Sequence, residues 1–168
     1  SHDAAESLGA VVQLGDLTLA VFTDMGEWDS VTVDAMSRAD VIVVEANHNL
    51  DMLKRGPYPA HLKRRVLSPM GHLSNDECGR LTETVQERSG KNPSIYLAHL
   101  SETNNSPAQA ITDVASFGGW RPDGLTALPR GSALDLLGNR PTARRPPIEV
   151  QQPLFSFSPH GDPLPGVD

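Results

Sequence analysis

The sequence has little of what marks several large classes of protein. It contains one cysteine, Cys78, in 168 residues, which excludes an internal disulfide framework and fits a reducing, cytoplasmic compartment. Aromatic residues make up only 5% of the chain, so its core must be mainly aliphatic. No apolar run approaches the roughly 20 residues that span a bilayer, and we expect no membrane partner.

Positive charge is also scarce. The 14 Lys and Arg against 21 Asp and Glu give a net charge of −7, which argues against a protein that coats nucleic acid.

What the chain does have is a series of short apolar runs. The runs "AVVQLG" (10–15) and "LTLAVFT" (17–23) are separated by a Gly-Asp pair and predict a β-hairpin. The runs "DVIVVEA" (40–46) and "SIYLAHL" (94–100) are continuous, which is typical of strands buried on both faces. "GLTAL" (124–128) predicts a last edge strand.

Amphipathic stretches lie between these runs. In "EWDSVTVDAMSR" the residues Trp28, Val31, Ala35 and Met36 share one face of a helix. Ser74 begins a capping box and a helix through about residue 88, and Ser106 with the following proline begins another over 106–117. The polar stretch between the runs at 40–46 and the capping box is expected to be partly helical at best. The order β-β-α-β-(loop)-α-β-α predicts an α/β layer arrangement.

The character of the chain changes after about residue 138. Residues 139–168 hold seven of the 14 prolines and have no helical period, so we expect a disordered tail after an ordered part over 1–138.

Three acidic or imidazole side chains stand at the ends of predicted strands. Asp24, Glu45 and His99 each follow or end an apolar run. Ligands gather at the carboxyl ends of strands in α/β sheets, although an acid at one such position is often only a turn or cap. With His2 and His72 the set contains three histidines and two carboxylates, the ligand and acid/base groups of a zinc-type metal site.

Nucleophilic sites are less well supported. Ser74 already serves as a helix cap, and Cys78 sits at core spacing, where a thiolate is disfavoured. The chain has no G-x-S-x-G elbow, and "SFGGW" (116–120) lacks the Lys-Ser/Thr of a phosphate-binding loop.

Five blocks of sequence, in order, resemble a known family. They are "SHDAAESLGA", "TDMGEW", "VVEANHNLDMLKRGPYP", "GHLSNDE" and "YLAHLSETNN". Together they resemble the second half of metallo-β-lactamase-fold hydrolases of the YycJ/WalJ-type branch, over roughly residues 1–115. The resemblance implies the C-terminal βα half of a four-layer αββα sandwich, and a dinuclear-zinc phosphodiesterase or nuclease that acts on DNA as a 5′-to-3′ exonuclease.

The resemblance also implies a ligand set. His2 would bind one metal ion, Asp24 would bridge two zinc ions (manganese being the other candidate), and His99 would bind the second ion. The family's H-x-H-x-D-H motif does not occur in this sequence. We therefore expect that the N-terminal half of the fold is missing and that the chain alone binds metal weakly and catalyses nothing.

Glu45 and His72 match a Glu–His pair that acts near the metals in related RNase Z-type enzymes. A histidine of this kind gives a proton to the leaving oxygen, while the carboxylate fixes its tautomer. Asn47 and His48 share the loop after Glu45 and either contact substrate or cap the next turn.

A basic region is either a solvated surface or a binding site for a phosphate backbone. It consists of Lys54, Arg55, Lys63, Arg64 and Arg65. Alternative functions are an RNase Z-like or cyclic-phosphate phosphodiesterase and a non-catalytic binding module. A β-lactam or thioester hydrolase is disfavoured, because acyl chemistry has little use for a proton donor aimed at a phosphate leaving group.

Overall fold

The computed structural model of the chain describes residues 9–130. In chain order the elements are β1 (Gly9–Leu14), β2 (Leu17–Phe22), α1 (Ser30–Met36), β3 (Val41–Glu45), α2 (Leu50–Arg55), α3 (Ala60–Val66), α4 (Asn75–Ser89), β4 (Ser94–Ala98), α5 (Pro107–Gly118), a 3₁₀ turn (Pro122–Gly124) and β5 (Leu125–Ala127). The predicted α/β class is confirmed. The boundary expected near residue 138 and the proline-rich segment 139–168 lie outside the described residues.

The five strands form one sheet in the order β1-β2-β3-β4-β5. β1 and β2 form the predicted antiparallel hairpin, in which Gly15 takes the left-handed conformation (φ 64°) that the turn requires. The pairs β2–β3, β3–β4 and β4–β5 are parallel. The carboxyl ends of β2, β3 and β4 therefore lie together at one edge of the sheet.

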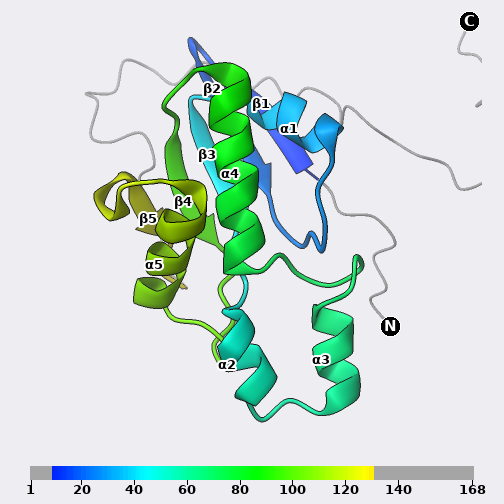
Figure 1. Cartoon of the computed structure of the whole chain (residues 1–168). Helices are drawn as coiled ribbons and strands as arrows, with labels where there is room; N and C mark the ends of the chain where they lie inside the picture. Colours follow the sequence, from blue (N-terminus) through cyan, green and yellow to red (C-terminus); the bar gives the residue numbers. More distant parts are fainter. Residues whose placement is uncertain (1–8, 131–168) are drawn as a thin grey trace, which may run out of the picture.

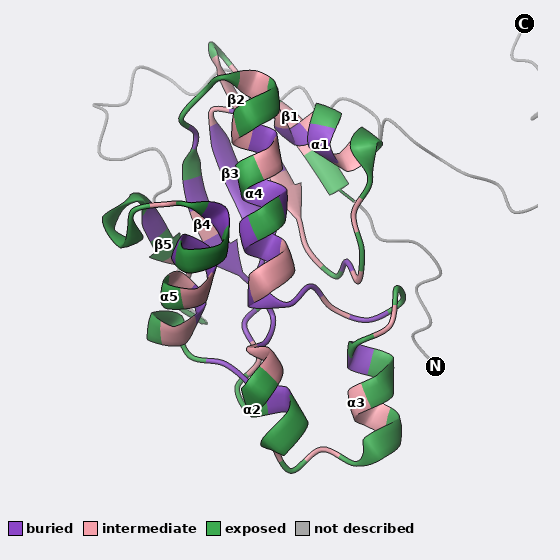
Figure 2. Cartoon of the chain, viewed as in Figure 1, coloured by how far each residue is buried: buried purple, intermediate pink, exposed green. Residues whose placement is uncertain are grey.

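Helices α1, α4 and α5 lie against one face of this sheet (Figure 1). This follows from the topology, because successive right-handed crossovers in one direction put every connecting helix on the same side. The core lies between these helices and the sheet, and β3, in the middle, is buried along its whole length (Figure 2). Ile42 and Val44 face the helices, and Leu97 of β4 packs beside them with no exposed surface.

Helix α1 buries part of the face that the sequence indicates, because Met36 is buried and Trp28 packs against the core, but Val31 is exposed. Val33 and Met36 are buried, at the i, i+3 spacing of one turn, while Val31 is 46% exposed. Val31 is the second residue of the helix and points away from the sheet. The helix begins at Asp29, whose side chain accepts a hydrogen bond from the Thr32 N–H.

The polar stretch after β3 is more helical than its sequence indicates. Helices α2 and α3 lie beyond one end of the sheet, at the bottom of the view, and most of their residues are exposed (Figure 2). The Asn49 side chain caps α2 by accepting a hydrogen bond from the Met52 N–H. Only Leu53 of α2 and Val66 of α3 are buried, and one buried apolar position in each helix is too few for hydrophobic periodicity to detect.

Helices α4 and α5 pack closely through two glycines. A Cβ on Gly79 would lie 2.8 Å from Phe117 Cβ and 3.1 Å from the Val114 carbonyl oxygen, and a Cβ on Gly118 would lie 2.7 Å from the Gly79 carbonyl oxygen. The neighbouring Cys78 is fully buried, and burial raises the pKa of its thiol, as expected for a core residue.

The opposite face of the sheet is also apolar. Val12, Leu19, Val21 and Tyr96 lie on it and are partly exposed, and Val41 and Val43 lie on it and are buried. A largely parallel sheet is normally covered on both faces. Within residues 9–130, no helix is long and apolar enough to cross a membrane.

Candidate active site

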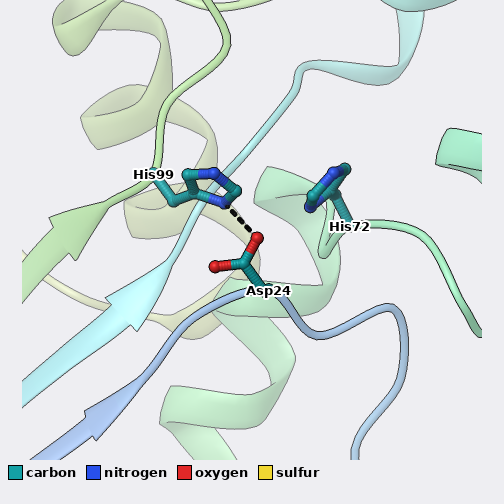
Figure 3. A group of neighbouring side chains, drawn as sticks. All are labelled: Asp24, His72 and His99. Carbon is teal, nitrogen blue, oxygen red and sulfur yellow. Dashed lines mark ion pairs between the residues drawn. The ribbon is translucent and has the colours of Figure 1, made fainter. Parts of the chain in front are cut away.

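The edge where β2, β3 and β4 end brings together residues from four segments. Asp24 follows β2, Glu45 ends β3, His99 follows β4, and His72 precedes α4. One ligand atom from each of Asp24, His72 and His99 lies within 4.8 Å of the others (Figure 3). The rings of His72 and His99 meet edge to face with centroids 5.0 Å apart. The expected convergence of Asp24 and His99 is thus present in the structure.

Glu45 lies beneath this group and binds both histidines. Its Oε1 accepts one hydrogen bond from His72 Nδ1 (2.9 Å) and another from His99 Nδ1 (2.8 Å), and its Oε2 accepts one from the Met25 N–H (2.7 Å). We assign the ring protons to Nδ1 because an ionised carboxylate only accepts. Glu45 has no exposed surface, so it orients the two rings and does not itself reach a substrate.

The hydrogen bonds between Glu45 and the two histidines shift the pKa values of Glu45 and His99. Burial alone would raise the pKa of Glu45, but the hydrogen bonds from His72, His99 and Met25 outweigh it and hold that pKa below its usual range. The hydrogen bond to Glu45 raises the pKa of His99. Burial and the positive charge of Arg130 oppose this rise. Asp24 adds a second carboxylate, with its Oδ1 3.6 Å from His99 Nδ1. The site therefore combines a buried carboxylate, Glu45, with a more exposed one, Asp24.

Asp24 and His99 both have left-handed backbones, with φ values of 59° and 55°. Among the described residues they are the only ones other than glycine with positive φ. Aspartate and histidine tolerate this conformation better than most residues, yet it still carries strain, which clusters at functional sites. The sharp turns after β2 and β4 bring the Asp24 carboxylate and the His99 ring toward each other (Figure 3).

The loop before α4 holds His72 in place. The His72 N–H donates to the Val66 carbonyl oxygen (3.0 Å), and a Cβ on Gly71 would lie 2.2 Å from that same oxygen. Only glycine allows the chain to pass this close to the end of α3. The next residues begin α4, where Ser74 Oγ accepts from the Glu77 N–H (3.2 Å) as predicted.

A buried network of amides supports the loops around the site. Asn105 donates to the Ala46 carbonyl oxygen (2.8 Å) and to Asn75 Oδ1 (2.8 Å), and Asn75 donates to Asp113 Oδ2 (2.9 Å). Local sequence patterns do not predict this network. Adjacent asparagines after a strand were the available signal, but their partners come from three other elements.

Asn47 and His48 occupy the loop after Glu45 in different ways. Asn47 Nδ2 donates to the His99 carbonyl oxygen (2.8 Å), which ties the β3 and β4 loops together. His48 is only 1% exposed, and neither of its ring nitrogens has a partner among the described residues. Burial, with the nearby charge of His72, lowers the pKa of His48 to about 4, although Glu45 pulls it the other way. A ring this deeply buried is out of reach of substrate in this conformation.

The donor set fits a divalent ion of intermediate softness. A carboxylate and two imidazoles are the ligands that zinc takes, and manganese also accepts them. His72 lies close enough to share this set. A metal-bound imidazole nitrogen cannot also give up a proton, so a ligand role and the acid/base role expected from the sequence are alternatives for His72. His2, the other predicted ligand, lies outside the described residues.

Comparison with known proteins gives relatives but no family model, since none matches the chain. An exodeoxyribonuclease YycJ from Bacillus anthracis is 38% identical over 115 residues, which is 68% of this chain and 43% of that protein. An exodeoxyribonuclease WalJ from Streptococcus pneumoniae serotype 2 is 36% identical over 106 residues, which is 62% of this chain and 38% of that protein. The chain thus spans less than half the length of these relatives. Over about two thirds of its own length, it is similar to curated exodeoxyribonucleases named YycJ and WalJ.

Proposed function

We propose that this chain forms part of a metal-dependent phosphodiesterase that acts on DNA ends, in the manner of a 5′-to-3′ exonuclease. The observation that carries the proposal is the convergence of Asp24, His72 and His99 at one sheet edge, with both histidines bonded to the buried Glu45. The similarity to proteins named exodeoxyribonuclease supports the choice of DNA as substrate.

Asp24 and His99 are the described residues that would hold metal, with His2 as the further ligand that the family resemblance implies. In the proposal Asp24 would help to hold two zinc ions, for which manganese is the alternative. Ions bound here supply Lewis-acid chemistry at the phosphoryl oxygens and a stronger nucleophile from water at neutral pH.

His72 is the proposed proton donor. Hydrolysis of a phosphodiester forms one bond to phosphorus and breaks another, and the leaving oxygen takes up a proton. The His72 side chain is 32% exposed, so a substrate can reach it. For this step the ring carries a proton on both nitrogens: Nδ1–H donates to Glu45, and Nε2 gives its proton to the leaving oxygen and leaves the ring neutral. Glu45 acts through both rings as a positioning residue.

The proposal also concerns the fold of the whole protein, of which this chain would form one half. We propose that the apolar second face of the sheet, with Leu19, Val21 and Tyr96, packs against another βα half to give a four-layer αββα sandwich. The partly exposed apolar side chains on this face support a second covering layer.

Zinc titration and hydrolysis by the full-length protein test the function. We expect Asp24→Ala and His72→Ala to lower kcat on bis-p-nitrophenyl phosphate and on 5′-phosphorylated DNA by about 100-fold or more, while Asp51→Ala and His61→Ala, on exposed positions of α2 and α3, retain activity. Activity that survives both site substitutions would exclude this mechanism, and absence of all hydrolysis would favour a non-catalytic module. Cleavage of cyclic phosphates in preference to DNA would favour the RNase Z-like alternative.

Glu45→Gln tests the positioning role. The amide keeps the size of the side chain but removes the charge that holds two ring N–H groups. We expect zinc affinity, measured by calorimetry, to fall by about 10- to 100-fold, whereas Glu87→Gln, on the exposed side of α4, keeps wild-type affinity. Equal affinities for the two variants would contradict this role of Glu45.

A further inference from the structure

A hollow of about 620 Å³ lies directly beside the candidate active site. Asn47 and His99 form the wall it shares with the site, and Tyr58, Glu102, Thr103 and Arg130 line the rest. Its volume falls within the range of roughly 300–1,000 Å³ that is usual for small-molecule sites. The hollow is therefore large enough for a group of nucleoside size.

The hollow is lined by charged side chains of opposite sign, Arg130 and Glu102. Arg130 donates to the Glu102 carboxylate and to the Leu100 carbonyl oxygen. The positive charge of Arg130 is also felt by His99, which sets the guanidinium close to the site. A paired arginine and glutamate attract a free phosphate weakly, but they offer donors and an acceptor to the edge of a nucleobase.

Flat apolar surfaces complete the lining. Tyr58 is half-buried in the loop between α2 and α3, and Leu128 and Pro129 follow β5. An aromatic ring at the wall of a nucleotide-sized hollow is the usual support for a stacked base. Because the hollow shares His99 with the proposed metal group, a base here would belong to the nucleotide whose phosphate lies at that group.

We propose that this hollow binds the terminal nucleoside of a DNA strand, with the base against Tyr58 and its polar edge at the Arg130–Glu102 pair, while the scissile phosphate lies at Asp24, His72 and His99. This inference rests on the proposed function and adds a nucleoside subsite to it. The subsite would require the terminal base to be unpaired.

Binding of thymidine 5′-monophosphate to the full chain, measured by calorimetry, tests the subsite apart from any activity. We expect Tyr58→Ala to raise the Kd by about tenfold, the loss typical of one stacked base, and Tyr58→Phe to keep most of the affinity. Phe117→Ala, on the exposed side of α5, removes an aromatic ring elsewhere and should leave the Kd unchanged. Equal Kd values for wild type, Tyr58→Ala and Phe117→Ala would overturn the subsite.

Hydrolysis separates this inference from the proposed function. The wild-type full-length protein should prefer an oligonucleotide with a normal terminal nucleotide over one with an abasic terminus, by about tenfold in kcat/KM, and Tyr58→Ala should lose that preference. Binding of the nucleotide without any hydrolysis would remove the proposed function and keep the subsite. Hydrolysis with no preference for the normal terminus would keep the function and remove the subsite.

Discussion

At the scale of single residues, the main feature is the left-handed backbone of Asp24 and His99. A side chain with a Cβ is strained there, and β-branched residues are strained most. The chain retains this conformation at the two positions where the turns bring the Asp24 carboxylate and the His99 ring together. The geometry of the site is thus obtained at some cost in stability, as is common at functional sites.

A pair of substitutions at Asp24 tests this strain. Asp24→Gly relieves the backbone but adds the chain entropy of glycine, so we expect an unfolding free energy within about 0.5 kcal/mol of wild type. Asp24→Val keeps a Cβ and adds a branch, and should be about 1–2 kcal/mol less stable than Asp24→Gly. Both lack the carboxylate and should lose zinc binding. Urea unfolding measures the difference, and equal stabilities of the two variants would contradict the strain.

His48 gives the chain a pH dependence of stability. Its folded-state pKa of about 4 lies below the ordinary value of 6.5, so between these pH values the unfolded chain binds more protons than the folded one. Stability contributed by neutral His48 is complete above pH 6.5 and is lost as the pH falls toward 4, by on the order of 3 kcal/mol. The charges that act on it come from His72 and Glu45.

We expect His48→Phe to reduce this acid sensitivity, because the buried ring no longer takes up a proton in the unfolded state. Unfolding free energies measured from pH 7 to pH 4 should fall less steeply for His48→Phe than for wild type. His61→Phe, at an exposed position on α3, serves as the matched control and should keep the wild-type slope. A slope unaffected by His48→Phe would show that His48 is not the group responsible.

For the site residues, the sequence pattern predicts which residues meet but not how they bond to one another. Asp24, Glu45 and His99 stand at strand ends, so position alone indicates that they meet at one edge. The sharing of Glu45 Oε1 between two rings depends on loop conformations far apart in the chain, and no local spacing encodes it. The sequence pattern also does not show that Tyr58 and Arg130 line one hollow, because these residues come together only in the folded molecule.

At the scale of elements, the strands and the helices that cover the sheet were predictable, whereas α2 and α3 were not. β3 is an apolar run that is buried on both faces, as its composition predicts. β4 is buried at Ile95, Leu97 and Ala98, but Ser94 is exposed and Tyr96 partly exposed, so the same prediction is wrong for its second face. Helices α4 and α5 carry serine caps that identify their first turns. In α1 the apolar residues offer more than one stripe, and contact with the sheet selects Val33 over Val31. Helices α2 and α3 have too little apolar periodicity to be detected.

The contact between α4 and α5 gives a prediction at this scale. In an exposed helix Gly79→Ala would stabilise by about 1 kcal/mol, but here the new methyl meets Phe117 and the Val114 carbonyl oxygen. We expect a net loss of about 1–3 kcal/mol because the two helices must separate. Gly124→Ala, where a Cβ meets nothing within 4 Å, is the control and should unfold at a temperature close to wild type. A Gly79→Ala variant as stable as wild type would mean that the helices separate without cost.

At the scale of the whole molecule, the two faces of the sheet differ. One is covered by α1, α4 and α5, and the other exposes part of Val12, Leu19, Val21 and Tyr96. A contiguous apolar surface on a protein in water favours association. The proposed second βα half would remove this surface from water.

We therefore expect the 168-residue chain alone to self-associate as its concentration rises, in sedimentation velocity experiments. The double substitution Leu19→Lys, Val21→Lys places charge on the apolar face and should give a monomer with an unchanged far-UV circular dichroism spectrum. Glu83→Lys, at an exposed position on α4, changes the charge on the covered side and should associate like wild type. A wild-type chain that stays monomeric at high concentration would contradict an uncovered second face.

The strand order in space repeats the order along the chain. Each new strand pairs with the strand that precedes it in the chain, so the sheet can grow in one direction as the polypeptide leaves the ribosome, although β4 can pair with β3 only after α2, α3 and α4 have been made. Asp24 and Glu45 are in place once β3 has joined, but the second imidazole arrives only with β4. A nascent chain halted after α4 would therefore hold a buried carboxylate with only one of its two ring partners, which makes addition of β4 the step that completes the site.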